Sequence, residues 1–454
     1  MTDLPDFLKQ GEPARLFPVL ADTSREKRMA SIFLSLLPQI PPLATAVLST
    51  VGMRVGKRTT IEAFTEVVLK EGSDTNDRPD GLLIVSTGKT TWSALIEAKI
   101  GKSKLGADQV QRYVEMAKAN GIDAVITISN EFVARADHSP VSIPKNLLRK
   151  TDLYHWSWTW LATQCEILAV QKAVEDREQT FLLNEVLRFL NHPGTGVERF
   201  SQMGSGWKDL VQAVTNNGTL KKTAAEVEEG VGCWFEEERD LSLHLSRHVG
   251  QPVETIIERK LKDDPVARLK AGISQLVDDQ CLASTYRIPD SAADIDVIAD
   301  LTRKTVSAGM KIKAPLDRKS TKARVNWLLR MLKEEDDRII IRAHWPGRAP
   351  ATQESLSVLR ENPDSLQTEN KDAAPHAFEV LLVESLGKRF AGRRTFIEDI
   401  ERIVPDFYDL VGQHLRAWQA PPPRPVKSRP ASIEEDVLQE DEDDYQASSG
   451  AAEG

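Results

Sequence analysis

The side chains best suited to chemistry lie in one short stretch of the chain. Asp80 stands in an Arg-Pro-Asp-Gly run, Glu97 and Lys99 are two residues apart, and Gln109 follows. Two carboxylates a few ångströms apart repel by about 4 kcal/mol at an effective dielectric constant of about 20, so such a pair needs an offsetting cation. Mg²⁺ prefers one or two carboxylates plus water and phosphate oxygens. These residues predict a Mg²⁺ site (Mn²⁺ possible) with ligands Asp80, Glu97 and the Ala98 carbonyl.

Such a site suits the hydrolysis of phosphodiester bonds. A bound divalent cation makes its water more acidic and holds the scissile phosphate in line. Lys99, placed beside the metal, can position the attacking water and stabilise the charge that builds on the phosphorus centre in the transition state. The residue types therefore predict a metal-dependent hydrolase in which Lys99 acts on the transition state.

The elements that must position these side chains begin with a hairpin. Two apolar runs, 82–85 and 92–96, flank a turn that contains Gly88, which predicts two antiparallel strands. This pairing brings Asp80, at the base of the first strand, close to Glu97, at the end of the second. Because side chains alternate along a strand, Glu97 and Lys99 point to the same face.

A helix and a further strand are expected to complete the sheet. Residues 107–119 carry an apolar stripe at helical spacing that stops at Asn120-Gly121, and 122–128 are nearly all apolar, as in a strand buried on both faces. A strand, a helix and a strand without a tight turn imply a right-handed crossover and a parallel pair. The predicted fold class is α/β, with a mixed sheet flanked by helices.

Residues 60–70 are interpreted as a helix that carries Glu62 and Glu66 one turn apart on one face. Either carboxylate could then reach the metal from above the sheet. The alternative is that both belong to a solvated helix face.

The pattern resembles the PD-(D/E)xK nuclease superfamily, which has the restriction-endonuclease-like fold. The matching residues are Asp80 after Pro79, then Glu97-Ala98-Lys99, and Gln109-x-x-x-Tyr113 is similar to the motif of the RecB-like branch. The resemblance covers about residues 55–165. It implies about four core strands flanked by helices, Mg²⁺ dependence, nucleic acid as substrate and a helix-borne acid at Glu66 or Glu62.

Several of these residues have plainer interpretations. Tyr113 continues an apolar helix stripe, so a core role competes with a role in the site. Lys102 and Lys104 either contact phosphates or form an ordinary basic loop. Beside a nuclease that favours DNA, the sequence leaves open a catalytically silent nucleic-acid-binding or regulatory protein, and an interaction adaptor. The intact Asp80, Glu97 and Lys99 favour the nuclease.

Bulk properties restrict the class of protein further. With 454 residues, 41% of them hydrophobic, the chain is long enough for two or three domains. We expect no membrane span, no signal peptide, no disulfide framework and no zinc site, because the three cysteines are scattered and only His244 and His248 are close in sequence. A cytoplasmic protein is the prediction. The predicted division is an N-terminal helical segment (1–50), a nuclease-like domain (51–200), a helical connector (201–280), a second α+β domain (281–420) and an acidic tail (421–454).

Within the nuclease-like part, 154–160 is expected to be an aromatic-rich strand that runs into a helix at 161–174. In the second domain we expect paired strands at 282–287 and 295–308, and a final helix at 395–418 that is interrupted at Pro405.

The charges are unevenly distributed. Between Arg303 and Lys333 there are ten basic residues and a single acid, which predicts phosphate contacts, with Lys319, Lys322 and Arg324 as candidates; the alternative is a solvated face. The net charge of −9 comes from residues 431–454, which hold nine acids and no Lys or Arg, because removing these acids from the 68 Asp and Glu leaves 59, equal to the 59 Lys and Arg. The tail is expected to be disordered and could bind a protein partner or shield a basic groove.

Overall fold

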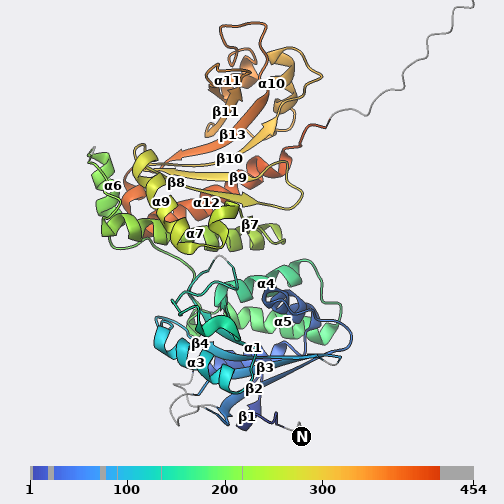
Figure 1. Cartoon of the computed structure of the whole chain (residues 1–454). Helices are drawn as coiled ribbons and strands as arrows, with labels where there is room; N and C mark the ends of the chain where they lie inside the picture. The colour runs from blue at the N-terminus through green and yellow to red at the C-terminus, as the bar shows by residue number, and fades with distance from the viewer. Residues whose placement is uncertain are drawn as a thin grey trace, which may run out of the picture. The chain divides into compact units, whose positions relative to one another are not determined.

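The computed structural model describes residues 4–18, 25–71, 78–88, 90–133, 135–216 and 218–419. The predicted acidic tail, 421–454, lies outside the described residues. Up to Trp418 the described residues form one compact unit. Two sheets, each with its own hydrophobic packing, divide this unit into an N-terminal region (4–198) and a C-terminal region (199–418) (Figure 1).

The N-terminal region is built on a mixed sheet of six strands in the order β1-β2-β3-β4-β5-β6. Neighbouring strands are antiparallel from β1 to β4, whereas β4, β5 and β6 are parallel, as the strand–helix–strand pattern predicted. The strands are β1 (Leu8–Pro13), β2 (Thr59–Leu69), β3 (Gly81–Thr87), β4 (Thr90–Ala98), β5 (Ala124–Ser129) and β6 (Asp152–Ser157).

Helices cover both faces of this sheet. One face packs on α1 (Arg25–Leu36), α2 (Pro41–Leu48), α4 (Trp158–Val170) and α5 (Arg177–Leu190), and the other packs on α3 (Ala107–Ala119). Short 3₁₀ turns lie at Ser49–Val51, Leu147–Arg149 and Pro193–Thr195. The predicted hairpin, the helix 107–119 and the buried strand after it are confirmed. Gly88, in the hairpin turn, has φ +64°, a conformation that glycine adopts without strain.

The prediction of a helix over residues 60–70 is wrong, because this segment is strand β2. Its sequence is rich in Thr, Val and Ile, whose β-branched side chains favour strands. Strand β2 pairs with β1 on one side and β3 on the other. These two ladders outweigh the helical spacing of Glu62 and Glu66.

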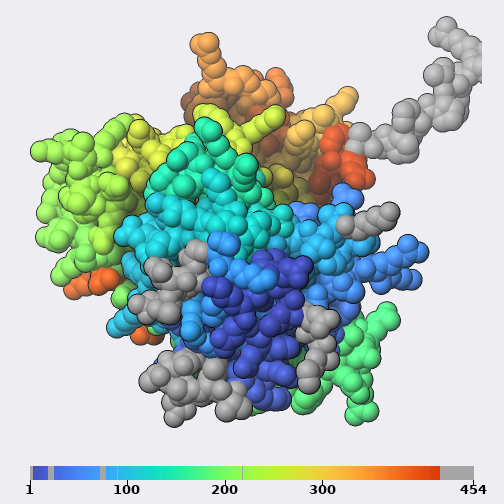
Figure 2. Space-filling view, turned by 60° about the horizontal axis from the view of Figure 1, so that its bottom comes forward, coloured from blue at the N-terminus to red at the C-terminus, as the bar shows by residue number. Residues whose placement is uncertain are grey.

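The N-terminal 50 residues are part of the same fold rather than a separate helical segment. β1 forms the edge of the sheet beside β2, and α1 and α2 bury apolar side chains in the core on one face of the sheet. Figure 2 shows the dark-blue surface of the N-terminal residues beside the lighter blue and cyan surface of later ones. The predicted aromatic strand ends at Ser157, and Trp158 and Trp160 begin helix α4.

The C-terminal region is built on an antiparallel sheet of seven strands in the order β12-β11-β13-β10-β9-β8-β7. The strands are β7 (Glu254–Thr255), β8 (Cys281–Arg287), β9 (Ile295–Asp300), β10 (Thr305–Lys313), β11 (Ile339–His344), β12 (Thr352–Ser355) and β13 (Ala377–Ser385). The single strand predicted over 295–308 is therefore two antiparallel strands. The prediction took 295–308 as one strand because apolar residues continue through the turn at Leu301–Lys304, where Lys304 has φ +56°.

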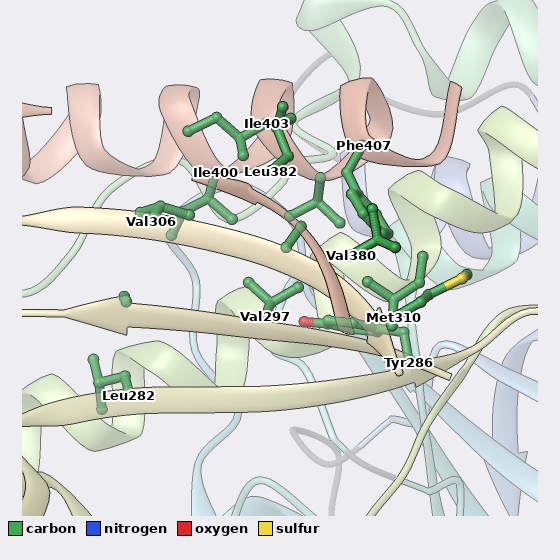
Figure 3. Packing of buried hydrophobic residues seen from close by; sticks show 14 of the residues in the cluster. Leu282, Tyr286, Val297, Val306, Met310, Val380, Leu382, Ile400, Ile403 and Phe407 are labelled. Carbon is green, nitrogen blue, oxygen red and sulfur yellow. The ribbon is translucent and has the colours of Figure 1, made fainter. Parts of the chain in front are cut away.

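The remaining helices are α6 (Trp207–Thr215), α7 (Ala225–Val249), α8 (Arg259–Lys262), α9 (Pro265–Asp279), α10 (Thr321–Leu329), α11 (Leu356–Glu361) and α12 (Arg393–Leu410). Short 3₁₀ turns lie at Gly387–Ala391 and Gly412–His414. In the core, Ile400, Ile403 and Phe407 of α12 lie over apolar side chains of the sheet (Figure 3).

Two further expectations for this region are corrected. The predicted connector, 201–280, is not a separate element, since Val227, Trp234 and Leu241 of α7 are buried in the core of the antiparallel sheet. Helix α12 also continues through Pro405 without the predicted interruption. Pro405 is itself buried, so packing of this helix stabilises it despite the missing backbone donor.

In the part of the chain that the structure describes, no single helix is long and apolar enough to cross a membrane. α1 and the segment Pro41–Val51 reach that length and composition only as a pair bent by 112°.

Candidate active site

Asp80 lies immediately before β3, at the end of the hairpin where β4 stops. Gly81 is paired with Ile96, so Asp80 faces Glu97 across the two strands, as predicted. A Cβ atom at Gly81 would come within 2.6 Å of the Leu34 side chain, which explains the glycine at this point. Asp80 is only 8% exposed, and its Oδ2 accepts a hydrogen bond of 2.9 Å from the Ala98 amide. Burial and, next, the Glu97 carboxylate raise the pKa of Asp80 to about 7.

Glu97 is the centre of the cluster. It is 2% exposed, and its Oε1 accepts hydrogen bonds from Lys99 Nζ and, at 2.8 Å, from Gln109 Nε2. Its Oε2 is buried without a hydrogen-bond partner among the described residues. Burial raises the pKa of Glu97. Burial acts to lower the pKa of Lys99, but the hydrogen bond and charge of Glu97 outweigh it, so the pKa is raised and Lys99 remains a cation.

The helix motif contributes a supporting network. Gln109 Nε2 also donates to Tyr113 Oη at 3.2 Å, and Tyr113 Oη donates to the carbonyl of Arg78 at 3.2 Å. Tyr113 is 2% exposed, so it both fills the core and holds the chain next to Asp80. Gln109 and Tyr113, one helical turn apart on α3, thus orient the carboxylate of Glu97 and the approach to β3.

Sequence reasoning missed Glu26, in the first turn of α1. Its Oε2 lies 3.7 Å from Lys99 Nζ, and its Oε1 accepts a weak hydrogen bond of 3.5 Å from the Ile100 amide. An acid in a first turn is stabilised by the helix dipole. Its place in the predicted N-terminal helical segment, 1–50, was a usable signal. The cluster therefore has a helix-borne acid, but it comes from α1.

Glu66 and Glu62 do not join the cluster. Glu66 sits at a bulge of β2 with φ +52°, and both its oxygens bind Lys27 Nζ, at 2.9 and 3.1 Å. Glu62 is paired with Ile84 in the middle of the sheet. Neither is a hydrogen-bond or ion-pair partner of Asp80, Glu97 or Lys99 in the part of the chain described. The expectation that either carboxylate completes the site is therefore corrected: β2 directs them elsewhere.

The donor set suits a hard divalent cation. Glu97 Oε2 is buried without a partner among the described residues, Asp80 lies across the hairpin from Glu97, and the charge of Glu26 acts on both carboxyl groups. No group of three or more His, Cys, Asp or Glu side chains among the described residues is arranged to hold a metal ion by itself. Mg²⁺ does not require such a group, because it keeps several waters and takes substrate phosphate oxygens as ligands.

The residues predicted to contact phosphates differ in exposure: the four lysines are exposed, whereas Arg324 is buried. Lys102 and Lys104 are exposed in the loop that follows Lys99, and Lys319 is exposed before α10. Lys322 is exposed, 3.7 Å from the Asp364 carboxylate.

Arg324 is 8% exposed, and its guanidinium donates to the carbonyls of Arg318 and Pro375, at 2.7 Å each. We withdraw Arg324 as a phosphate contact, because this side chain holds the loops around α10 together.

Comparisons of the chain with protein-family models, with curated proteins and with solved structures found no match.

Proposed function

We propose that this protein is a metal-dependent nuclease with a restriction-endonuclease-like N-terminal region. The observation that carries the proposal is the convergence of Asp80, Glu97 and Lys99 at one end of the β3–β4 hairpin, with Glu26 of α1 beside them. Four acidic or basic side chains meet there, from α1, from the start of β3 and from the end of β4, and one buried carboxylate oxygen has no partner in the part of the chain described. The mixed sheet with helices on both faces is the setting that this fold provides.

In the proposed site Asp80, Glu97 Oε2 and the carbonyl of Ala98 would hold Mg²⁺ or Mn²⁺, with Glu26 close enough to bind one of its waters. The bound cation would supply a more acidic water and neutralise charge on the phosphate. Lys99 remains protonated beside Glu97 and can donate to the attacking water or to a phosphate oxygen. Gln109 holds Oε1 of the Glu97 carboxylate, which leaves Oε2 as the oxygen proposed to bind the metal.

Nucleic acid is the proposed substrate, with DNA favoured over RNA. The decisive assay incubates the purified protein with single-stranded DNA, duplex DNA and RNA in Mg²⁺, in Mn²⁺ and in chelator. We expect cleavage that depends on the metal and that Glu97→Gln abolishes, since an amide is a far poorer ligand than a carboxylate. Binding without cleavage of any substrate in either metal would favour a catalytically silent nucleic-acid-binding protein.

A second measurement tests the metal ligand itself. A metal at one hundred times its Kd should stabilise the folded protein by about 2.7 kcal/mol, and Asp80→Asn should remove that gain. Asp123→Asn is a matched control, because Asp123 Oδ2 also accepts a backbone N–H, that of Ser93 at 2.8 Å, at the opposite end of β4. Both variants should lower the melting temperature, but only Asp80→Asn should lose the response to metal. A full response in Asp80→Asn would exclude Asp80 as a ligand.

A further inference from the structure

The backbone amides and carbonyls of Lys99 and Ile100, where the next turn begins, are all paired. The Lys99 amide donates to the Ile128 carbonyl at 2.8 Å, and its carbonyl accepts from Trp158 Nε1 at 2.9 Å. Ile100 binds Glu26 through its amide and Ser103 through its carbonyl, at 3.2 Å for the latter. The backbone that carries Lys99 is therefore held by β5, α4 and α1, through Ile128, Trp158 and Glu26.

Gly101, in this turn, is held by a segment far away in sequence. Its amide donates to the Gly196 carbonyl at 2.9 Å. Gly196 has φ +81°, and a Cβ atom there would lie 3.2 Å from the Gly101 nitrogen, so the close approach of the two backbones favours glycine at position 196. Residues 196–198 thus form one side of the turn behind Lys99.

Asn130, directly after β5, joins these two backbones. Its Nδ2 donates to the Gly196 carbonyl at 2.8 Å and to the Gly101 carbonyl at 3.2 Å, and its Oδ1 accepts from the Glu198 amide at 3.1 Å. One half-buried side chain therefore makes three hydrogen bonds to two separate segments. Without Asn130 the Gly196 carbonyl keeps the Gly101 amide, but the half-buried Gly101 carbonyl and the Glu198 amide lose these partners. An unpaired polar group costs up to about 1–3 kcal/mol when it is buried, so removing Asn130 should loosen both segments.

The segment that Asn130 holds is the one that leads into the C-terminal region. Met203, five residues after Glu198, is fully buried in the core of that region, and its amide and carbonyl both bind Arg393 of α12, at 3.1 and 2.7 Å. A short stretch of chain therefore connects the core of the antiparallel sheet to the turn behind Lys99.

We propose that Asn130 is a positioning residue that ties the segment leading into the C-terminal region to the turn behind Lys99. Release of this segment would displace Lys99 and lower turnover, while leaving the metal ligands in place. The catalytic part of this inference rests on the proposed nuclease function. The structural part, the coupling of the two segments through Asn130, does not.

The test compares Asn130→Ala with Asn120→Ala. Asn120 is a matched control, because its Nδ2 also donates to two carbonyls, those of Glu71 and Met116 at 2.8 Å each, at the far end of α3. Amide hydrogen exchange of residues 99–103 and 194–200 gives a readout that needs no activity. In Asn130→Ala we expect exchange at least about ten-fold faster in both segments, and in Asn120→Ala none of this change.

In steady-state assays Asn130→Ala should lower kcat about ten- to one hundred-fold with KM nearly unchanged, because a displacement of about 1 Å costs this much. Unchanged exchange at 99–103 would overturn the proposal, and faster exchange with wild-type kcat would overturn its catalytic part. If the wild type cleaves nothing, the nuclease proposal fails and exchange alone decides on the coupling. If Asn130→Ala does not fold, Gly196→Ala gives the same test from the other side, since it must separate the two backbones.

Discussion

Both regions of this protein bury carboxylates, but they surround them differently. In the N-terminal region Asp80 and Glu97 receive hydrogen bonds from Ala98, Lys99 and Gln109, which come from a strand, its end and a helix. In the C-terminal region Glu237 and Asp240 are fully buried on one helix, α7, and none of their carboxylate oxygens has a hydrogen-bond partner among the described residues.

The pKa values alone do not separate the two groups. Burial, with the nearby Glu97 charge, raises the pKa of Asp80 to about 7, and burial raises the pKa of Asp240 to about 6 and of Glu237 well above its usual range. A perturbed pKa indicates burial first and function only second. Convergence of a fixed cation, amide donors and acids from several elements is what distinguishes the N-terminal site.

The largest expected effect concerns Lys99, the cation that donates a hydrogen bond to the buried Glu97 carboxylate. Lys99→Ala should lower kcat by about two to three orders of magnitude and leave affinity for nucleic acid nearly intact, since Lys99 acts mainly on the transition state. Lys118→Ala, an exposed lysine in the last turn of α3, serves as the control. Equal cleavage by wild type and Lys99→Ala would place the chemistry elsewhere in the chain.

The second prediction tests the interpretation that the α7 acids serve no bound partner. The pKa of Asp240 is raised in the folded protein because of burial, opposed by Arg247 and His244 on α7 and by Arg199, and reinforced by Glu401 of α12. Since the folded state binds this proton more tightly than the unfolded state, stability falls as the pH rises from about 4 to about 6. Asp240→Asn should therefore stabilise the protein above pH 7 by an amount on the order of 2 kcal/mol, less whatever burying the amide costs.

Urea unfolding at pH 4.5, 6 and 8 measures this gain, which should shrink towards low pH. Asp278→Asn, an exposed aspartate on α9, should change the free energy of unfolding by no more than about 0.5 kcal/mol at any of these pH values. If the effect of Asp240→Asn on the free energy of unfolding is the same at pH 4.5 and pH 8, then Asp240 does not bind its proton more tightly in the folded state, and this account of the buried carboxyl group is wrong.

The smallest effect is expected from a charge reversal that tests whether the C-terminal region contacts nucleic acid. Lys319→Glu combined with Lys322→Glu should weaken affinity a few-fold at low salt and reduce the salt slope by about 2, if each lysine neutralises one phosphate. Binding titrations from 50 to 200 mM salt measure both quantities. The same affinity and slope as wild type would assign this segment to an ordinary solvated face, as the pairing of Lys322 with Asp364 already favours for one of the two residues.

The sequence determined those parts of the fold that depend on local patterns. The hairpin, helix α3 and strand β5 follow from turn residues and from the spacing of apolar side chains, and these elements alone suffice to bring Asp80, Glu97 and Lys99 together. The helix predicted over 60–70 is wrong because two local signals conflict there: the spacing of the Glu residues is helical, whereas the β-branched residues favour a strand. Only the pairing of this segment with β1 and β3 resolves the conflict.

Tertiary structure alone decided which distant side chains complete the site. Glu26 reaches Lys99 because α1 packs against the sheet, and no local pattern links residues that are 73 positions apart. Charge spacing likewise did not reveal that Arg324 is buried against backbone carbonyls, whereas Lys319 is exposed. Asn130 likewise binds Gly101 and Gly196 only because the fold brings these distant segments together. A side chain's type restricts what it can bind, but its partners are set by the packing of elements far apart in the chain.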